Sequence, residues 1–591
     1  MRMFKYSLAA AAAAFALTGC LGDGNETASV LAAPVAQATP VMPAADPGRI
    51  ATTQALTTGN VIFIHPDGAG ANHWAAHRMY FRGLDGSSNW DLLPDMAIYR
   101  GHLVNLVAGT SHGSATTHAF GFKVDAFGSF GMDGDGNLNP PANRAIRSLS
   151  GFNGSLMRQA ANAGMPVGVV NDGHIGEPGT GAFLAEVGNR NNWQEITRQM
   201  ILGRDGMNDT APWVIMGGGE ADALPAGATT VHRNVNQERG APINSRASLR
   251  TDDLNLIDAW NRMGSSNMSN DPAQRDDFIV VRTRAEFEAL RRALTAHPTY
   301  APRVLGLFAF QDTFNDRNEQ DLINRGFVRA GMAAGEVGPA PDKQSRLVLF
   351  GDFDAAEPGF NPPTFAEMTY VALTILSRAA AQQRTPEQQR FFLVAEPESI
   401  DNFGNNTNAV GMLHAMEQTD RAIGVATDFQ RRAGNERTLI LTAADSDAGG
   451  MTVLSGTIPG VTGVTSPSGI LPPGTAPSIA GSVTSNPTAV PAGAPAAPVV
   501  TNFVDGVEGR QTPLFVTEPD QFGNRMQFGI IWPGSADYHG GILARSAGVN
   551  AGMLRTHFSA RFDNIDVYRM KHATLFGRLL DYPTATRAPG R

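Results

Sequence analysis

The sequence predicts an α/β fold, a three-layer α/β/α sandwich with a mostly parallel central sheet. From Asn60 to about Tyr582, short runs of β-branched and aromatic residues alternate with helical patterns, which is typical of a parallel sheet covered on both faces. Many of these runs lead into Gly or Pro, as buried strands do where loops begin. At 591 residues the chain can bury a large core, and α/β proteins of this length often form one domain.

Four of the strand-like runs end at or near an acidic residue or a histidine. They cover residues 60–68, 391–401, 438–446 and 528–540. In an open parallel sheet, ligands bind beyond the carboxyl ends of the strands. Carboxylates and an imidazole brought there from distant parts of the chain are suitable ligands for a divalent cation. The sequence therefore predicts a metal-hydrolase site at this edge of the sheet.

Residues 1–20 have the pattern of a bacterial lipoprotein signal peptide. Basic residues precede a short apolar stretch, and Leu17-Thr-Gly-Cys20 resembles a lipobox, in which the cysteine becomes the lipidated N-terminus. Cys20 is the only cysteine, so no intramolecular disulfide is expected. We expect a lipid anchor in the membrane of the bacterial cell envelope, or secretion if the leader is an ordinary signal peptide. Residues 21–58, rich in Ala and Pro, suit a flexible tether.

The composition of the chain and one low-complexity segment predict its partners and its domain organisation. The net charge is −9, so the chain has no basic footprint for nucleic acid, which we exclude as a partner. Residues from about 456 to 500 are dominated by Gly, Pro, Ser, Thr, Ala and Val, and predict an exposed insertion or a flap that overhangs the site. The catalytic domain is expected to span residues 59–582.

Two local patterns predict structure and not function. Thr364 and Glu367 have capping-box spacing at the start of a helical pattern, whose apolar face packs on the core. The segment Asp133-Gly-Asp-Gly-Asn137 imitates the start of a calcium loop, but Arg144 stands where the closing acidic ligand belongs. A hairpin turn is therefore expected there.

The hydroxyl-rich segment 106–123 contains Thr110-Ser111-His-Gly-Ser114 and ends in Gly121-Phe-Lys123. These residues, in a segment that follows the strand ending at Asp67, resemble the nucleophile segment of bacterial alkaline phosphatases. Further motifs follow in the order of that family, beginning at Val167, Met216, Leu305, Asn361 and Phe391. The chain is thus identified as a member of the alkaline phosphatase superfamily. The resemblance implies that fold and the hydrolysis of phosphate monoesters through a phosphoserine.

The resemblance also implies roles for individual residues. Gly121-Phe-Lys123 sets a register in which Ser111 is the nucleophile; the alternative register makes it Thr110, and Ser114 is a third candidate. Arg190 matches the phosphate-binding arginine. The metal positions carried over are Asp67, Glu177, Thr180, Glu396, Asp401, Asn405, Asp445, Ser446 and His539.

This chain departs from the family at several metal positions. Asn405 and Ser446 stand where the family has histidines, Glu177 replaces an Asp or His, and Thr180 is one residue out of place. Oxygen ligands suit Mg²⁺, Mn²⁺ or Ca²⁺, whereas imidazole favours Zn²⁺. We therefore expect Mg²⁺ first, with Mn²⁺ or Ca²⁺ as alternatives and a weakened preference for Zn²⁺. Candidates for restoring a nitrogen are His112, His118 and His174.

Three functions fit these residues. The first is a phosphomonoesterase that acts on small-molecule phosphate esters, because an arginine aimed at two oxygens of a dianion favours the monoester. The second is a phosphodiesterase or sulfatase on the same fold. The third is a surface protein that binds phosphate or metal after losing catalysis, which the missing histidines support and the retained acidic residues oppose. Family members are often dimers, so a homodimer is one option.

Overall fold

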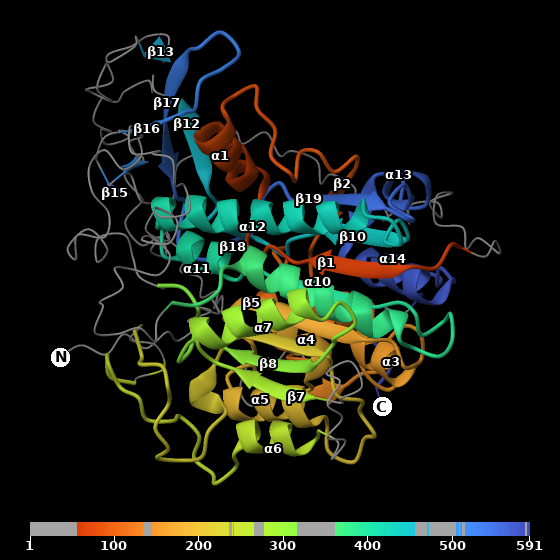
Figure 1. Ribbon diagram of the computed structural model, residues 1–591. Coiled ribbons are helices and arrows are strands. Elements are labelled where there is room, and N and C mark those ends of the chain that lie inside the picture. The colour runs from red at the N-terminus through yellow and green to blue at the C-terminus, as the bar shows by residue number, and fades with distance from the viewer. Residues whose placement is uncertain are drawn as a thin grey trace, which may run out of the picture. The chain divides into compact units, whose positions relative to one another are not determined.

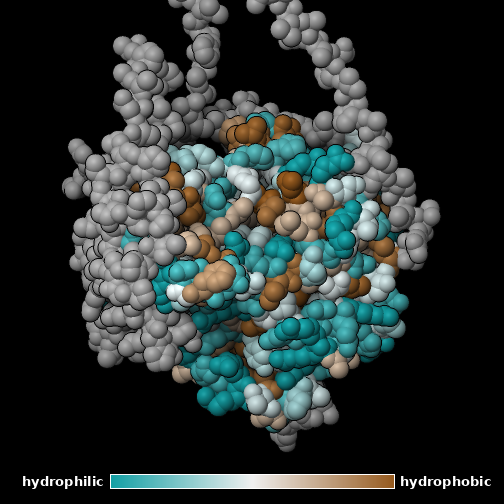
Figure 2. Space-filling model, turned by 90° about the horizontal axis from the view of Figure 1, so that it is seen from above, coloured by the Kyte–Doolittle hydropathy of each residue, from teal (hydrophilic) through white to brown (hydrophobic). Residues whose placement is uncertain are grey.

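The computed structural model describes residues 56–134, 143–235, 239, 241–264, 277–315, 361–455, 470–471, 504–507, 509–510, 514–584 and 588–590. The expected signal peptide with Cys20, nearly all of the tether and most of the 456–500 insertion lie outside these residues. Within them, no helix has the length and apolar character needed to cross a membrane. On the face seen in Figure 2, hydrophobic side chains are scattered among hydrophilic ones.

A ten-stranded sheet organises the described residues (Figure 1). Its order is β20-β2-β19-β10-β1-β9-β5-β6-β8-β7, and every neighbouring pair is parallel except the two pairs made by β19. The predicted fold class is confirmed. In sheet order the strands are Arg561–Asp563, Asp95–Arg100, Leu543–Gly548, Thr438–Thr442, Asn60–Ile64, Phe392–Glu396, Val167–His174, Val214–Gly218, Arg303–Leu307 and Phe278–Val281.

Helices cover both faces of this sheet. Phe391 and Phe392 are consecutive residues of an extended segment, so their side chains point to opposite faces. Phe391 packs on Phe429 of α12 (Ala409–Gln430), whereas Phe392 packs on Phe183 of α4 (Pro178–Leu184). In Figure 1, α10 and α12 lie in front of the strands and α14 lies behind β1. The other helices are α1 (Ala71–Arg82), α2 (Ser111–Phe120), α3 (Leu156–Asn162), α5 (Trp193–Leu202), η2 (Glu220–Asp222), α6 (Leu256–Arg262), α7 (Arg284–Ala296), α10 (Phe365–Ala381), α11 (Ser399–Asn405), α13 (Met553–Thr556) and α14 (Asn564–Phe576).

One of the four predicted sheet strands belongs to a different sheet. β17 (Arg525–Ile531) pairs antiparallel with its neighbours, so the prediction that run 528–540 is a parallel strand is wrong. A parallel pair needs a long crossover, usually a helix, and the described residues between β10 and β17 contain none. Its six-stranded sheet also contains β12 (Thr452–Ser455), β13 (Ile470–Leu471), β14 (Asp505–Gly506), β15 (Gly509–Arg510) and β16 (Phe515–Val516).

The predicted capping box is confirmed, whereas residues 135–142 of the predicted hairpin turn lie outside the described residues. Thr364 caps α10 by accepting a hydrogen bond from the backbone N–H of Glu367, which completes the capping box. The strands β3 (Met132–Asp133) and β4 (Arg144–Ala145) pair antiparallel, as a hairpin requires. Asp133 Oδ2 lies 2.8 Å from the guanidinium of Arg144, so this carboxylate already has a cationic partner.

Candidate active site

The ends of three neighbouring strands bring buried carboxylates to one place. Asp67 follows β1, Glu396 ends β9, and Asp445 follows β10. Each of these residues is at most 1% exposed. Because β1 lies between β9 and β10 in the sheet, residues that are more than 300 positions apart in the sequence meet at one edge.

A glycine allows a fourth carboxylate to approach. Gly68 has a φ of +72°, and a Cβ built on it would lie 2.9 Å from Asp401 Oδ1 and 2.6 Å from the side chain of Ala448. The left-handed backbone and the lack of a side chain both require glycine here. Its N–H donates to Asp445 Oδ1 at 3.2 Å, so this turn joins the ends of β1 and β10. Asp401 itself lies in α11, which follows β9.

The electrostatics of this cluster favour bound cations. Burial, and then the charges of Asp445 and Asp401, raise the pKa of Asp67 well above its usual value. Burial and the neighbouring Asp537 do the same to the pKa of Asp401. Buried like charges this close cannot all remain ionised unless cations lie between them. A set of carboxylates is also the donor type that hard divalent ions prefer.

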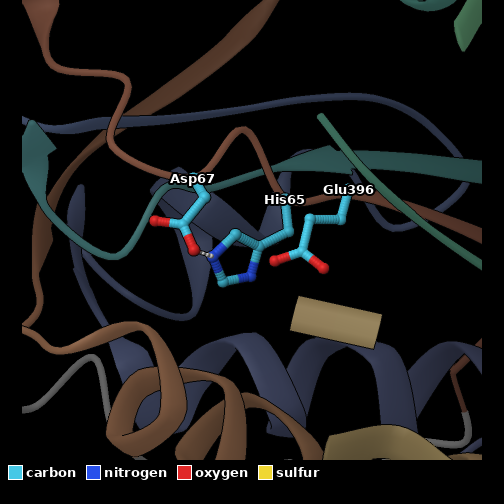
Figure 3. Close-up of side chains that lie close together, drawn as sticks. All are labelled: His65, Asp67 and Glu396. Atoms are coloured by element: carbon cyan, nitrogen blue, oxygen red, sulfur yellow. Dashed lines mark ion pairs between the residues drawn. The ribbon is translucent and has the colours of Figure 1, made fainter. Parts of the chain in front are cut away.

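His65 lies within the cluster, and the sequence analysis gave it no role. Its Nε2 is 4.0 Å from Asp67 Oδ2 and 3.9 Å from Asp445 Oδ1. Among the described residues, neither ring nitrogen and neither carboxylate oxygen of Asp67 has a hydrogen-bond partner. His65, Asp67 and Glu396 each offer one ligand atom, and these atoms lie within 4.8 Å of one another (Figure 3). The signal was present in the sequence, because His65 directly follows the apolar run of β1.

Glu396 is held by donors from β5 and from the start of α4. Its oxygens accept hydrogen bonds from Asn171 Nδ2 at 2.5 Å, from the N–H of Gly179 at 2.7 Å and from Thr180 Oγ1 at 3.2 Å. The structure therefore brings Thr180 to Glu396. Glu177 precedes this helix, and burial, followed by the charge of Asp312, raises its pKa well above the usual value.

Three further acidic residues, which the sequence motifs did not indicate, join the cluster. Glu398 is 3% exposed, its Oε2 has no partner in the described part of the chain, and burial and then Glu177 raise its pKa well above the usual value. Burial and then Asp445 raise the pKa of Asp537 to about 6. Asp312 accepts a hydrogen bond from the N–H of His174 at 2.7 Å. The excess of buried negative charge is thus larger than the family motifs implied.

The positions with the greatest departures from the family lie in different surroundings. Asn405 Nδ2 donates to both oxygens of Asp401 and to Asp537 Oδ1, so this nitrogen joins two carboxylates. The Ser446 hydroxyl is buried and has no partner within the described ranges. His539 is exposed and interacts electrostatically with His102, and the structure does not bring it into the buried cluster.

The predicted nucleophile segment lies against the cluster. Ser111 is the first residue of α2 and is 6% exposed, while Thr110 caps the helix by accepting the N–H of Gly113 at 3.3 Å. A Cβ built on Gly109 would lie 2.5 Å from both the backbone oxygen of Asp445 and Ser114 Oγ. This close approach fixes the segment beside the end of β10. The N-terminus of a ten-residue helix is also a favourable place for an anion.

Arg190 lies between this segment and the acidic residues. Its guanidinium is 3.6 Å from Glu177 Oε2 and 3.5 Å from His112 Nδ1. The opposite nitrogen of His112 donates to the backbone oxygen of Ala126 at 2.9 Å. Burial and the Arg190 charge lower the pKa of His112 to about 4, so the ring is neutral at physiological pH. The side chain of Arg190 is 30% exposed and can reach a ligand from solvent.

The histidines considered as replacement ligands have partners of their own. His112 contacts Ala126 and Arg190. His118 Nε2 lies 2.7 Å from the hydroxyl of Tyr99. His174 lies 3.1 Å from Asp222 through Nε2 and accepts the N–H of Gly176 through Nδ1. Among the described residues, the imidazole that lies with Asp67, Asp445 and Glu396 is that of His65.

Comparisons with known proteins show what the chain is similar to. The family model described as alkaline phosphatase matches residues 58–467. A membrane-bound alkaline phosphatase from Bombyx mori is 24% identical over 413 residues, which are 65% of this chain and 60% of that protein. The match with the structure of Thermus thermophilus alkaline phosphatase covers 90% of this chain and 93% of that protein, with a TM-score of 0.52 and 15% identity. The match with the structure of alkaline phosphatase from the Antarctic bacterium TAB5 covers 88% of this chain and 99% of that protein, with a TM-score of 0.48 and 15% identity.

Proposed function

The chain belongs to the alkaline phosphatase family, and we propose that it hydrolyses phosphate monoesters with divalent metal ions and a serine nucleophile. One observation carries the proposal: Gly109 packs against the backbone of Asp445 and so holds the start of α2 at the buried carboxylates. The hydroxyl of Ser111 would then be available to a phosphoryl group that the partly exposed Arg190 can also reach. Small-molecule phosphate esters are the substrates that such a site accepts.

Each residue has a defined part in this reaction. Ser111 Oγ gives its proton to water and forms a bond to phosphorus while the bond to the leaving oxygen breaks, and that oxygen takes a proton from water. Arg190 holds two non-bridging oxygens of the dianion through its paired N–H groups. The first turn of α2 favours the same negative charge. Water then attacks the phosphoserine, inorganic phosphate leaves, and the proton returns to Ser111.

The buried carboxylates would hold the metal ions. Asp67 and Glu396 lie at one position with Asp445 beside Asp67, and Asp401 lies beside Asp537 at another. Bound ions would neutralise the phosphoryl oxygens and lower the pKa of the attacking hydroxyl. We propose Mg²⁺ as the principal ion, with Mn²⁺ or Ca²⁺ as alternatives, because oxygen donors predominate. For the location we propose a lipid anchor at Cys20 in the bacterial cell envelope, which rests on the sequence alone.

A substrate panel tests this proposal against its two rivals. The full chain, supplied with Mg²⁺, should release phosphate from an aryl phosphate faster than it cleaves a bis-aryl phosphate diester or an aryl sulfate. A preference for the diester or the sulfate would replace the monoesterase with the corresponding enzyme on this fold. Tight binding of inorganic phosphate without turnover of any ester would support the non-catalytic surface protein.

A further inference from the structure

We propose that His65 is a metal ligand in this chain, and that its Nε2 binds an ion that Asp67 and Asp445 also hold. The family motifs that assign the other metal positions give no role to this residue. The inference rests on the proposed function in that it requires an ion among these carboxylates. Metal binding can be measured without turnover, so the role of His65 as a ligand and the proposed phosphatase activity can be rejected separately.

The surroundings of His65 leave its nitrogens available. The residue is fully buried, and in the described part of the structure neither ring nitrogen has a hydrogen-bond partner. Phe63 and His118 pack against the ring in T-shaped arrangements, with centroids 5.8 Å and 5.1 Å away, and so fix its orientation. In Figure 3 the ring lies between Asp67 and Glu396. A bound ion would satisfy a buried imidazole that is held rigidly without partners.

The spacing of the ligand atoms fits a shared ion better than a hydrogen bond. Nε2 lies 4.0 Å from Asp67 Oδ2 and 3.9 Å from Asp445 Oδ1. A hydrogen bond between nitrogen and oxygen spans about 2.7–3.2 Å, so both separations are too long. An ion about 2.0–2.1 Å from a nitrogen and about 2.0–2.2 Å from an oxygen allows separations up to about 4.3 Å. Both distances lie within that limit.

A second buried cluster provides the contrast within this chain. His77 Nε2 lies 2.9 Å from Glu417 Oε2, which is a direct hydrogen bond. The same carboxylate pairs with Arg82 at 2.8 Å and with Arg421 at 2.9 Å. That cluster therefore contains its own cations. Among the described residues, no lysine or arginine forms an ion pair with Asp67, Asp445 or Glu396, so the balancing charge must come from elsewhere.

The consequence is a division between two kinds of metal site. The position at His65 has one nitrogen among its oxygen donors, which suits a borderline ion such as Zn²⁺, Co²⁺ or Mn²⁺. At the second position Asn405 donates its N–H groups to Asp401 and Asp537, which leaves carboxylate oxygens as ligands. An all-oxygen site suits Mg²⁺ or Ca²⁺. His65 thus replaces, at a new position, part of the nitrogen lost at Asn405 and Ser446.

The test measures metal binding by the full chain after chelation and dialysis. Wild type, His65→Gln and the control His77→Gln are titrated with Co²⁺ and separately with Mg²⁺, and the bound metal is counted by elemental analysis. We expect His65→Gln to lower Co²⁺ affinity at least about tenfold. Losing even a residue that only hydrogen-bonds to a metal ligand typically lowers metal affinity by about that factor. Mg²⁺ binding should change less, and His77→Gln should bind Co²⁺ like wild type.

A measurement on wild type alone decides the question if His65→Gln does not fold. Pulsed EPR of the Mn²⁺-loaded chain should show coupling to one directly bound imidazole nitrogen. Wild-type protein without that coupling, or folded His65→Gln with unchanged Co²⁺ affinity, would overturn the inference. Phosphate release from an aryl phosphate is assayed in parallel, so that an inactive protein that still binds Co²⁺ through nitrogen would reject the phosphatase and retain the ligand.

Discussion

The amide nitrogen of Asn405 donates hydrogen bonds to both carboxylate oxygens of Asp401, at 3.0 Å and 2.9 Å. The same nitrogen donates to Asp537 at 3.2 Å, and the amide oxygen accepts the N–H of Gly449 at 3.1 Å. At a position where the sequence resemblance implies an imidazole in the family, this chain has an amide that holds two carboxylates together. The lost ligand is thus replaced by a support for other ligands.

Replacing Asn405 with alanine should destabilise the metal-free protein. The buried Asp401 and the partly buried Asp537 would lose their shared donor, which we expect to cost about 2 kcal/mol in the free energy of unfolding. Saturating Mg²⁺ should recover part of this loss, since a cation can take over the role of the donor. Urea unfolding with chelator and with Mg²⁺ measures both values, and Asn402→Ala on the same helix is the control. An equal loss under both conditions would contradict the supporting role.

Ser111 and Thr110 can be separated by one pair of variants. Ser111→Ala should lower turnover of an aryl phosphate by several orders of magnitude and leave the fold intact, because only metal-assisted hydrolysis by water remains. Thr110→Ala removes the cap of α2 and should cost about 1 kcal/mol of stability with a smaller effect on turnover. Trapping of a phosphorylated intermediate on acid quench provides a second readout. An active Ser111→Ala beside an inactive Thr110→Ala would identify Thr110 as the nucleophile.

Metal identity follows from the donor set as a whole. After chelation, activity should return with Mg²⁺, Mn²⁺ or Ca²⁺ at least as well as with Zn²⁺, because oxygen donors outnumber His65. Changing Asn405→His and Ser446→His together should move the preference towards Zn²⁺, and Ser446 has a buried hydroxyl without a partner in the described chain. Reconstitution is followed as activity per bound ion. A wild type that regains activity only with stoichiometric Zn²⁺ would show that nitrogen donors dominate the site.

The sequence predicted the parts of the site that follow directly from strands. Asp67, Glu396 and Asp445 end apolar runs, and the strand order β10-β1-β9 brings them together. Asp537 could not be predicted in this way, because it reaches the cluster through the pairing of β18 (Asp537–Tyr538) with β11 (Asp447–Ala448), which no local pattern indicates. The run 528–540 shows the same limit, since an apolar segment does not specify its sheet. Glu398 lies two residues from Glu396, at a position to which the family motifs give no role.

The buried amine of Lys571 allows a prediction about pH and stability. Lys571 lies in α14, is fully buried, and its Nζ is 4.0 Å and 4.4 Å from the ring centroids of Phe63 and Phe183. Its Nζ has no hydrogen-bond partner in the described ranges. Burial lowers the pKa of Lys571 well below its usual value. The unfolded chain therefore binds a proton that the folded chain does not bind between those two pKa values.

The sign of this linkage predicts that Lys571→Met stabilises the protein at pH 7. Below the unfolded-state pKa of about 10.4, each fall in pH favours the protonated, unfolded chain, so the native lysine costs stability at neutral pH. The advantage of the methionine variant should shrink as pH rises from 7 to 9.5, measured by urea unfolding with saturating Mg²⁺. Lys123→Met is the matched control, because Lys123 Nζ lies 3.0 Å from Asp563, and this variant should lose stability at pH 7. A Lys571→Met protein less stable than wild type at both pH values would show that the contacts with Phe63 and Phe183 outweigh the cost of burying the amine.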